Sequence, residues 1–278
     1  MTGHLLFWAA APAMVMSAWL LHVSQAPRSA QAMQFVVAGI ASAAFLVFAR
    51  GRSLGWYGHN RWLALILVLS LFIPLLTSLQ GGPERWLDLG SARLYVAPVV
   101  LPAVLFLLEA LMLRAPGVAV ATVSVASIAL VLQPDAAQMS ALAMAILVLL
   151  FATNSPLLLR LALLAVLLTS GVAAWCIPDP LAPVPYVEGV FSVAYEVSPF
   201  VLAAALMCAA IPVIALVWAA WVTRSSGMLA VAAYYAFLFA LAPLQITPVP
   251  LLGFGAGPIL GYLFVAGLVL RPNANQPA

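Results

Sequence analysis

Long apolar runs follow one another along almost the whole chain, separated by short polar or proline-rich connections. Most of them approach the roughly 20 residues that an α-helix needs to cross a bilayer. Inside lipid every backbone amide and carbonyl must be hydrogen-bonded within the protein, so we expect these runs to be helices. The pattern predicts ten of them, at 3–23, 31–49, 62–80, 94–113, 117–133, 138–152, 156–176, 189–222, 227–246 and 255–270.

The composition agrees with this pattern and excludes a soluble domain, because 66% of the residues are hydrophobic and only 6% are charged. We therefore expect an all-α fold, a polytopic membrane bundle of about ten helices that forms a single domain over residues 1–278. The eighth run is longer than a bilayer requires, which predicts a tilt or a bend near Pro199 or Pro212. The basic residues are scattered singly between apolar runs, so nothing favours nucleic acid as a partner.

The arginines predict the orientation. With the N-terminus in the cytoplasm, most of the arginines lie on cytoplasmic connections, as the positive-inside rule requires. The cytoplasmic set is Arg50, Arg52, Arg61, Arg114, Arg160, Arg224 and Arg271, and the outer set is Arg28, Arg85 and Arg93. Both termini are then cytoplasmic, since ten spans are an even number. Most of the acids lie on the other side, so any chemistry is expected to face outward.

The stretch from 183 to 200 concentrates polar groups at the start of the eighth run. Its first prolines keep the approach extended, and a helix can begin near Glu188. On such a helix Glu188, Ser192, Tyr195 and Glu196 form one polar stripe, at i, i+4, i+7 and i+8. A carboxylate within a membrane span costs a few kcal/mol, so the stripe indicates either a functional site or a polar contact between helices.

Three other polar features have structural interpretations as well as functional ones. The turn-rich segment 81–90 carries Arg85 and Trp86 and can be a solvated loop. Asp135 ends the fifth run after a proline and can cap the next helix. Glu109 lies within the fourth run, where we expect it to pair with Arg114 near the cytoplasmic face.

Residues 247–258 form a proline- and glycine-rich break between the last two runs. Irregular backbone at membrane depth is tolerated only against protein or a water-filled cavity. The break is therefore interpreted either as a plain turn or as the wall of an outward cavity, packed against the eighth run near Glu188. The two cysteines and three histidines are too dispersed for a metal or redox motif, so no metal-ligating residues are predicted.

The order of these motifs resembles that of the SEDS family, the FtsW/RodA-like cell-wall glycosyltransferases. Residues 14–18 (MVMSA) are similar to the family's first-span "MVxSA", and 85–90 (RWLDLG) to its "RRWxxLG" loop. Residues 132–135 (LQPD) match the "LQPD" that closes the fifth span. Residues 187–196 align without gaps on "TDFIFAVIGE", and 243–256 on "PVTGVPLPFVSYGG". The resemblance covers nearly the whole chain.

This resemblance implies a polymerase of the bacterial inner membrane that joins lipid II, a lipid-linked disaccharide, on the outer face. The family's essential aspartate falls on Glu188, which would be the general base. Arg85 would contact the diphosphate leaving group, and a divalent cation could assist its departure. A single-span transpeptidase, a class B penicillin-binding protein, is the implied partner, within the surrounding lipids. The other matching positions would bind substrate: Trp86, Asp135, Ser192, Glu196, Pro248, Pro250, Gly253 and Gly255.

The sequence also departs from the family. Glu188 replaces an aspartate, and the "QPSE" motif falls on 95–98 (YVAP), which removes its glutamate. The long outer segment before "TDF" is shortened to about 171–188, and Gly253 replaces a serine. These departures support an alternative, a non-catalytic relative that binds a polyprenyl-linked sugar or scaffolds an envelope complex. A transporter is a third hypothesis, which the absence of an internal repeat in the sequence disfavours.

Overall fold

The computed structural model describes residues 2–50, 60–77, 85–88, 93–178 and 182–269. In chain order, the helices are α1 (Thr2–Ala9), α2 (Ala11–Val23), α3 (Arg28–Arg50), α4 (Asn60–Leu69), the 3-10 turn η2 (Ser70–Phe72), α5 (Ile73–Thr77), α6 (Ala97–Arg114), α7 (Pro116–Leu132), α8 (Ala136–Ala152), α9 (Leu157–Cys176), α10 (Val190–Val197), α11 (Pro199–Thr223), α12 (Ser226–Leu241), the 3-10 turn η3 (Ala242–Leu244) and α13 (Ala256–Val269).

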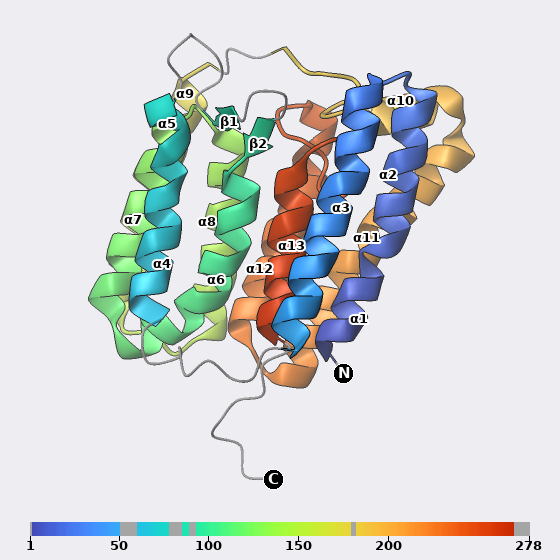
Figure 1. The fold of residues 1–278 in the computed structure, drawn as a ribbon. Helices are drawn as coiled ribbons and strands as arrows, with labels where there is room; N and C mark the ends of the chain where they lie inside the picture. The colour runs from blue at the N-terminus through green and yellow to red at the C-terminus, as the bar shows by residue number, and fades with distance from the viewer. Residues whose placement is uncertain (1, 51–59, 78–84, 89–92, 179–181, 270–278) are drawn as a thin grey trace.

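The helices stand side by side in one bundle, which confirms the predicted all-α membrane fold (Figure 1). Within the described residues six helical segments are long and apolar enough to cross a membrane, and four shorter apolar ones accompany them. A small antiparallel hairpin, β1 (Trp86–Asp88) with β2 (Arg93–Tyr95), closes one end of the bundle. We call this the hairpin end. The first helix begins and α13 ends at the opposite end (Figure 1).

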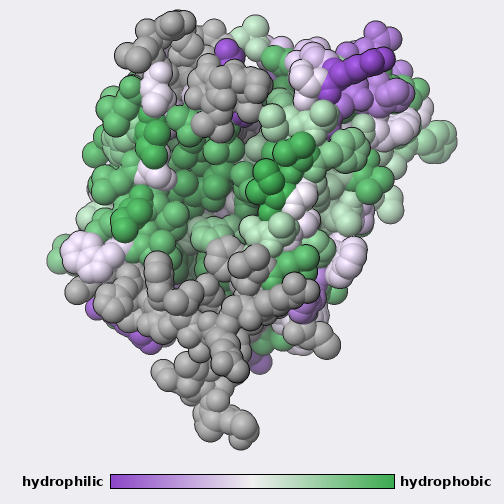
Figure 2. All heavy atoms as spheres, viewed as in Figure 1, coloured by the Kyte–Doolittle hydropathy of each residue, from purple (hydrophilic) through white to green (hydrophobic). Residues whose placement is uncertain are grey.

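The surface agrees with this assignment. Figure 2 shows apolar residues over the middle of the face that it draws, with polar residues gathered near the ends. Large apolar side chains are exposed along the outer helices, for example Phe151, Leu158 and Phe200. Exposed apolar surface on this scale suits lipid rather than water. The chain is therefore a multi-pass membrane protein.

Prolines and short polar side chains set the helix ends. Ser198, Ser225 and Asp135 are N-caps, and each side chain accepts a hydrogen bond from the amide three residues later. The cap that the sequence predicted at Asp135 is thus present. Ser198 is extended, with φ −173°, and Pro199 occupies the first turn of α11, where its missing amide costs nothing.

Several of the predicted runs do not form one continuous helix. The run expected at 189–222 is two helices, α10 and α11, because the chain turns at Ser198 instead of bending within one helix; Pro212 lies inside α11. The run at 3–23 divides at Ala10, just before Pro12, since a proline ring clashes with the carbonyl four residues earlier. The run expected to begin at 94 starts in β2, and its helix begins at Ala97.

Helices α6, α12 and α13 form the centre of the bundle. Glycines allow α13 to approach α6 closely: a Cβ at Gly257 would lie 2.4 Å from the Tyr95 carbonyl oxygen, and one at Gly261 only 2.0 Å from that of Pro98. No side chain fits at such distances, so both glycines are required by the packing. The N-terminal part of α13 is therefore held against the segment that joins β2 to α6.

One sequence-based expectation at the far end of α6 is wrong. Glu109 does not pair with Arg114. Its carboxylate instead accepts hydrogen bonds from the Ser225 hydroxyl (2.7 Å) and from the backbone amides of Ser226 and Gly227 (3.0 Å each). These groups begin α12, whose N-terminal amides lack partners within the helix and favour a negative charge.

Candidate functional site

Glu188 lies in a tight turn just before α10, not within a helix that crosses the bundle. The Val184 carbonyl accepts hydrogen bonds from the amides of Val187, Glu188 and Gly189, and the Glu188 carboxylate accepts one back from the Val184 amide (2.9 Å). This reciprocal bonding fixes the turn and buries the carboxyl group, leaving the residue 8% exposed.

The proline- and glycine-rich break packs directly onto this turn. The Val249 amide donates to the Val187 carbonyl (3.2 Å), and the Phe254 amide donates to that of Tyr186 (2.9 Å). Gly253 faces the same place, because a Cβ there would lie 2.3 Å from the Val187 carbonyl oxygen. The structure thus explains why this chain has glycine where the resembling family has serine. The predicted packing of the break near Glu188 is present.

The prolines of the break contribute shape rather than exposed polar groups. Pro248 and Pro250 are both buried, as is Gly255, whose φ of 159° is open to glycine. Thr247, which precedes them, is fully buried, and its hydroxyl has no hydrogen-bond partner. A buried hydroxyl in this state costs free energy, so the break holds one polar group that the fold itself does not satisfy.

A second group of buried polar side chains lies at the base of the hairpin. The Tyr95 hydroxyl donates to the Asp135 carboxylate, and the guanidinium carbon of Arg85 stands 5.9 Å from the centre of the Tyr95 ring. Trp86 is the residue opposite Tyr95 in the hairpin, and its ring stacks on the Tyr95 ring with the two ring centres 5.0 Å apart. Arg85 is only 4% exposed and Asp135 is fully buried, so this is a charged cluster removed from solvent.

Burial raises the pKa of Tyr95 well above its ordinary value, and the negative charge of Asp135 raises it further, while Arg85 lowers it. Tyr95 therefore stays protonated and serves as a donor to Asp135. The network continues through Asp135, which accepts from the Gln138 amide (3.1 Å), to Gln138, whose side chain accepts from the Tyr234 hydroxyl. The sequence analysis indicated Arg85 and Asp135 but missed Tyr95. The available signal was the position of Tyr95 at the start of the segment that aligns with the family's QPSE motif.

The break connects the two groups. Gly253 contacts the turn of Glu188 at Val187, and Gly257, four residues later in the first turn of α13, contacts Tyr95. The candidate residues Glu188, Gly253 and Asp135 thus belong to one continuous region at the hairpin end, although they are far apart in the sequence.

Two predicted site residues lie outside this region. Ser192 and Glu196 are both exposed on α10, and Ser192 accepts a hydrogen bond from the Gln245 side chain (2.9 Å). Because the helix begins at Val190, Glu188 is not part of it, and the predicted polar stripe is divided between the turn and the helix. Glu196 belongs to the short helix α10 and not to the long helix α11.

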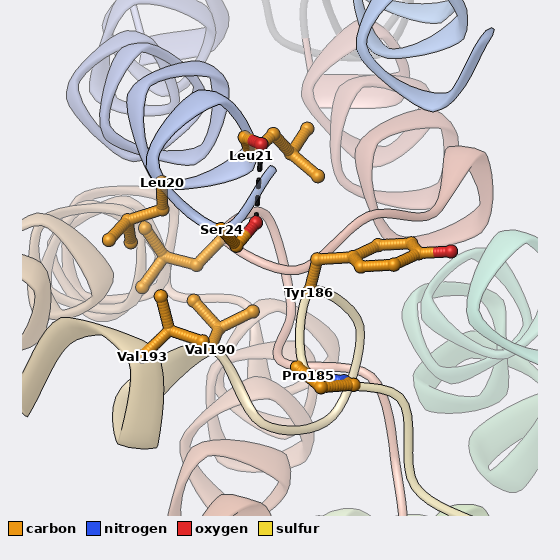
Figure 3. Close-up of a pocket in the computed structure, with 8 residues that line it drawn as sticks. Leu20, Leu21, Ser24, Pro185, Tyr186, Val190 and Val193 are labelled. Atoms are coloured by element: carbon orange, nitrogen blue, oxygen red, sulfur yellow. Dashed lines mark hydrogen bonds between the residues drawn. The ribbon is translucent and has the colours of Figure 1, made fainter. Parts of the chain in front are cut away.

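A small pocket beside the turn is lined by Leu20, Ser24, Tyr186 and Val190 among others, and it has no space for a water molecule (Figure 3). Ser24 points across it and donates to the Leu21 carbonyl (3.2 Å). Among the residues that the structure describes, no three histidine, cysteine, aspartate or glutamate side chains stand together as metal ligands.

Comparison with known structures identifies the architecture. RodA, the rod shape determining protein of Thermus thermophilus, matches with a TM-score of 0.71 and 20% identity, over 95% of this chain and 94% of RodA. A single-residue mutant of that RodA matches with a TM-score of 0.72 and 19% identity over 95% of both chains. A chain from a peptidoglycan synthase complex, described as coordinating polymerization and crosslinking, matches at 0.69 and 18%, again over 95% of both.

No protein-family model matches this sequence, and no curated protein matches it either. The evidence of relationship is therefore structural. At identities of 18–20%, such matches establish the fold, and the chemistry has to be argued from the residues of the site. The chain has the RodA fold, and the resemblance to the SEDS family that its motifs predicted is confirmed at the level of that fold.

Proposed function

We propose that this protein is a SEDS-type glycosyltransferase that polymerises a lipid-linked disaccharide, lipid II, at the hairpin end. One observation carries the proposal: within a RodA fold, a buried carboxylate at the position of the family's essential aspartate is held against the break that lines the same end. The motif resemblance and the arginine distribution put the hairpin end on the outer face of the bacterial inner membrane, with both termini cytoplasmic.

In this proposal the Glu188 carboxylate accepts the proton of the acceptor sugar's hydroxyl. The hydroxyl oxygen then bonds to C1 of the donor sugar as the bond from C1 to the diphosphate oxygen breaks, and the polyprenyl diphosphate leaves with the electron pair. A general base must be within hydrogen-bond reach of its proton. The hydrogen bond from the Val184 amide fixes the position of the carboxylate until the acceptor arrives.

Arg85 and its neighbours would receive the leaving group. A buried guanidinium can stabilise a diphosphate by charge-assisted hydrogen bonds, and the Tyr95–Asp135 pair fixes the surroundings of that guanidinium. The described residues offer no set of ligands for a divalent cation. A divalent cation bound to the diphosphate would help to neutralise the charge that develops on the leaving group.

The partner proposal follows from the structural match. One match is a chain of a complex described as coordinating polymerization and crosslinking. We infer that this protein likewise works beside a single-span transpeptidase.

A second candidate function is that of a non-catalytic relative, which binds a polyprenyl-linked sugar without turnover or scaffolds an envelope complex. Two features favour it: Glu188 replaces the family's aspartate, and its carboxylate already has a structural role in closing its own turn with the Val184 amide. In the catalytic proposal that carboxylate exchanges this hydrogen bond for one from the acceptor hydroxyl.

Reconstitution into vesicles with radiolabelled lipid II and a divalent cation tests the proposal. We expect polymer from the wild type and at least about a hundredfold less from Glu188→Gln, the scale of general-base catalysis. Glu188→Asp should retain activity. Glu196→Gln, an exposed glutamate on α10, is the matched control and should polymerise like the wild type. Equal polymerisation by wild type and Glu188→Gln contradicts the assigned base; binding without any turnover selects the non-catalytic function.

A further inference from the structure

Gln138 and Tyr234 extend the buried cluster at the hairpin into the interior of the bundle, and the proposed transfer gives them no role so far. The Tyr234 hydroxyl, near the middle of α12, donates to the side-chain oxygen of Gln138 in the first turn of α8. Both residues are buried, with 1% or less of their surface exposed. Helices α8 and α12 pack directly against each other, so this bond lies inside a helix–helix contact.

The Asp135 carboxylate is held from two sides. Its Oδ1 atom accepts from the Gln138 backbone amide (3.1 Å), and its Oδ2 atom accepts from the Tyr95 hydroxyl. These donors belong to different elements, the first turn of α8 and strand β2. Bonds to both oxygens fix the plane of a carboxylate as well as its position. The orientation of Asp135 is therefore set jointly by the hairpin and by the start of α8.

The start of α8 is itself fixed by Tyr234. The first turn of a helix is its least constrained part, because its amides have no partners within the helix. Gln138 makes two bonds there, one through its backbone amide to Asp135 and one through its side chain to Tyr234. The side-chain bond ties the turn to α12. A shift of that side chain also shifts the amide that Asp135 accepts from.

The other end of this chain of bonds lies beside Arg85. The guanidinium carbon stands 5.9 Å from the centre of the Tyr95 ring, and that ring is held at its hydroxyl by Asp135 and across its face by Trp86. A guanidinium presents its donors in a rigid planar fork, so its orientation decides whether it can meet a phosphate with two bonds. Because Arg85 is only 4% exposed, its protein neighbours set that orientation.

An apolar contact could join α8 to α12 without burying polar groups. Membrane helices associate mainly through close packing, and hydrogen bonds between them add little on average. The bond from Tyr234 differs from a simple inter-helix bond because it leads, through Gln138, to a buried carboxylate. Tyr262 offers the contrast: it is buried to the same extent, but its hydroxyl donates to a backbone carbonyl, that of Pro212 (3.4 Å), and joins α13 to α11.

We propose that Gln138 and Tyr234 are positioning residues, which act through Asp135 and Tyr95 to hold the Arg85 guanidinium in the orientation that receives a diphosphate. The inference rests on the proposed function and adds to it a control of the diphosphate site from inside the bundle. Neither residue touches the substrate. The charge on the diphosphate grows as its bond to C1 breaks, so a misaligned guanidinium should slow turnover more than it weakens the binding of lipid II.

The rate at which phenylglyoxal, an arginine reagent, modifies Arg85 tests the positioning without any substrate. The internal reference is Arg93, which is exposed on the neighbouring strand of the full-length protein in micelles. We expect Tyr234→Phe and Gln138→Leu to raise the Arg85 rate several-fold and to leave the Arg93 rate unchanged. Tyr262→Phe is the matched control and should modify like the wild type. Equal Arg85 rates in all four proteins, or an equal rise in Tyr262→Phe, overturn the proposal.

Polymerisation by the reconstituted protein is the second measurement. Tyr234→Phe should lower kcat per folded molecule at least about tenfold, since a misplacement of 1 Å can cost roughly a hundredfold, while KM for lipid II stays nearly unchanged. The double variant Gln138→Leu/Tyr234→Phe should lose no more than either single variant, because each removes the same bond. A merely structural role would lower the amount of folded protein and leave its kcat unchanged.

The two measurements separate the failure of this inference from the failure of the proposed function. If the wild type polymerises lipid II and Tyr234→Phe has the same kcat, the positioning is wrong and the transfer stands. If the wild type makes no polymer, the transfer is wrong. In that case a faster modification of Arg85 in Tyr234→Phe still supports the positioning, and an equal rate overturns it.

Discussion

Glu109 and Glu188 are two intramembrane or membrane-edge glutamates at opposite ends of the bundle, and they are bonded differently. Glu109 accepts three hydrogen bonds from residues 116 to 118 positions away in the sequence, which fastens α6 to the start of α12. Glu188 accepts a bond from Val184, four positions away, and so closes its own turn. The first carboxylate joins distant elements, whereas the bond from Val184 to the second closes the segment in which Glu188 itself lies.

The difference shows how to separate a structural acid from a functional candidate. Long-range bonds stabilise the fold, because breaking them separates helices that no local contact holds together. A local bond can be exchanged for a bond to a substrate while the helices stay in place. Glu188 also lies against irregular backbone, where movement is less costly than within a helix. We therefore expect opposite consequences when the two residues are substituted.

The largest effect on stability is expected for Glu109→Ala. It removes the acceptor of three donors, two of them backbone amides at a helix start. The free energy of unfolding should fall by about 3 kcal/mol, because charge-assisted bonds are worth about 1.5–3 kcal/mol each and are not additive. Denaturant unfolding in micelles measures it, with Glu109→Gln as the control that keeps one acceptor. An unchanged denaturant midpoint of unfolding would show that Glu109 does not hold α6 to the start of α12.

Gly253→Ala should disturb the other end. The new Cβ would lie 2.3 Å from the Val187 backbone carbonyl, so the turn that holds Glu188 must move. Overpacking of this kind costs about 1–3 kcal/mol, and we expect polymerisation to fall together with stability. Gly171→Ala on α9 is the matched control, since a Cβ there meets nothing within 4 Å. If Gly253→Ala unfolds and polymerises like Gly171→Ala, the break and the turn are not packed as described.

Tyr95→Phe tests the buried cluster that the break connects to Glu188. It removes the hydroxyl that donates to Asp135 and leaves that carboxylate short of a partner. The expected loss is about 1–2 kcal/mol in unfolding free energy, measured by the same denaturant titration. The control is Tyr186→Phe, because Tyr186 is only partly buried and contacts the break through its ring. A loss equal to that of Tyr186→Phe would remove Tyr95 from the network.

The smallest effect is expected for Gln245→Ala. Its bond to Ser192 joins the break to the exposed face of α10. An exposed hydrogen bond of this kind should change stability by less than about 0.5 kcal/mol, and polymerisation should stay at the wild-type level. Ser192→Ala, which removes the other partner, should match it. A large loss of activity in both variants would return α10 to the candidate site.

The sequence by itself determined the helical fold and marked several of its helix starts. Apolar runs that must satisfy their own backbone in lipid can only be helices, and Ser225 and Asp135 mark helix starts by the same local chemistry that makes them caps. Of the two prolines that predicted a bend in the eighth run, Pro199 lies where the run divides, while Pro212 lies inside α11. These features depend on neighbouring residues, so they can be read from the chain in order.

Only the tertiary structure decided which polar residues meet. Glu109 joins Ser225 rather than Arg114, and Tyr95 joins Asp135, because helix packing brings together residues that are far apart in the sequence. The space available to Gly253 depends on a carbonyl of another segment, and no local pattern reports it. Likewise, the bond between Tyr234 and Gln138 becomes visible only once α8 and α12 are placed, since satisfaction of a buried polar group is a property of the whole fold.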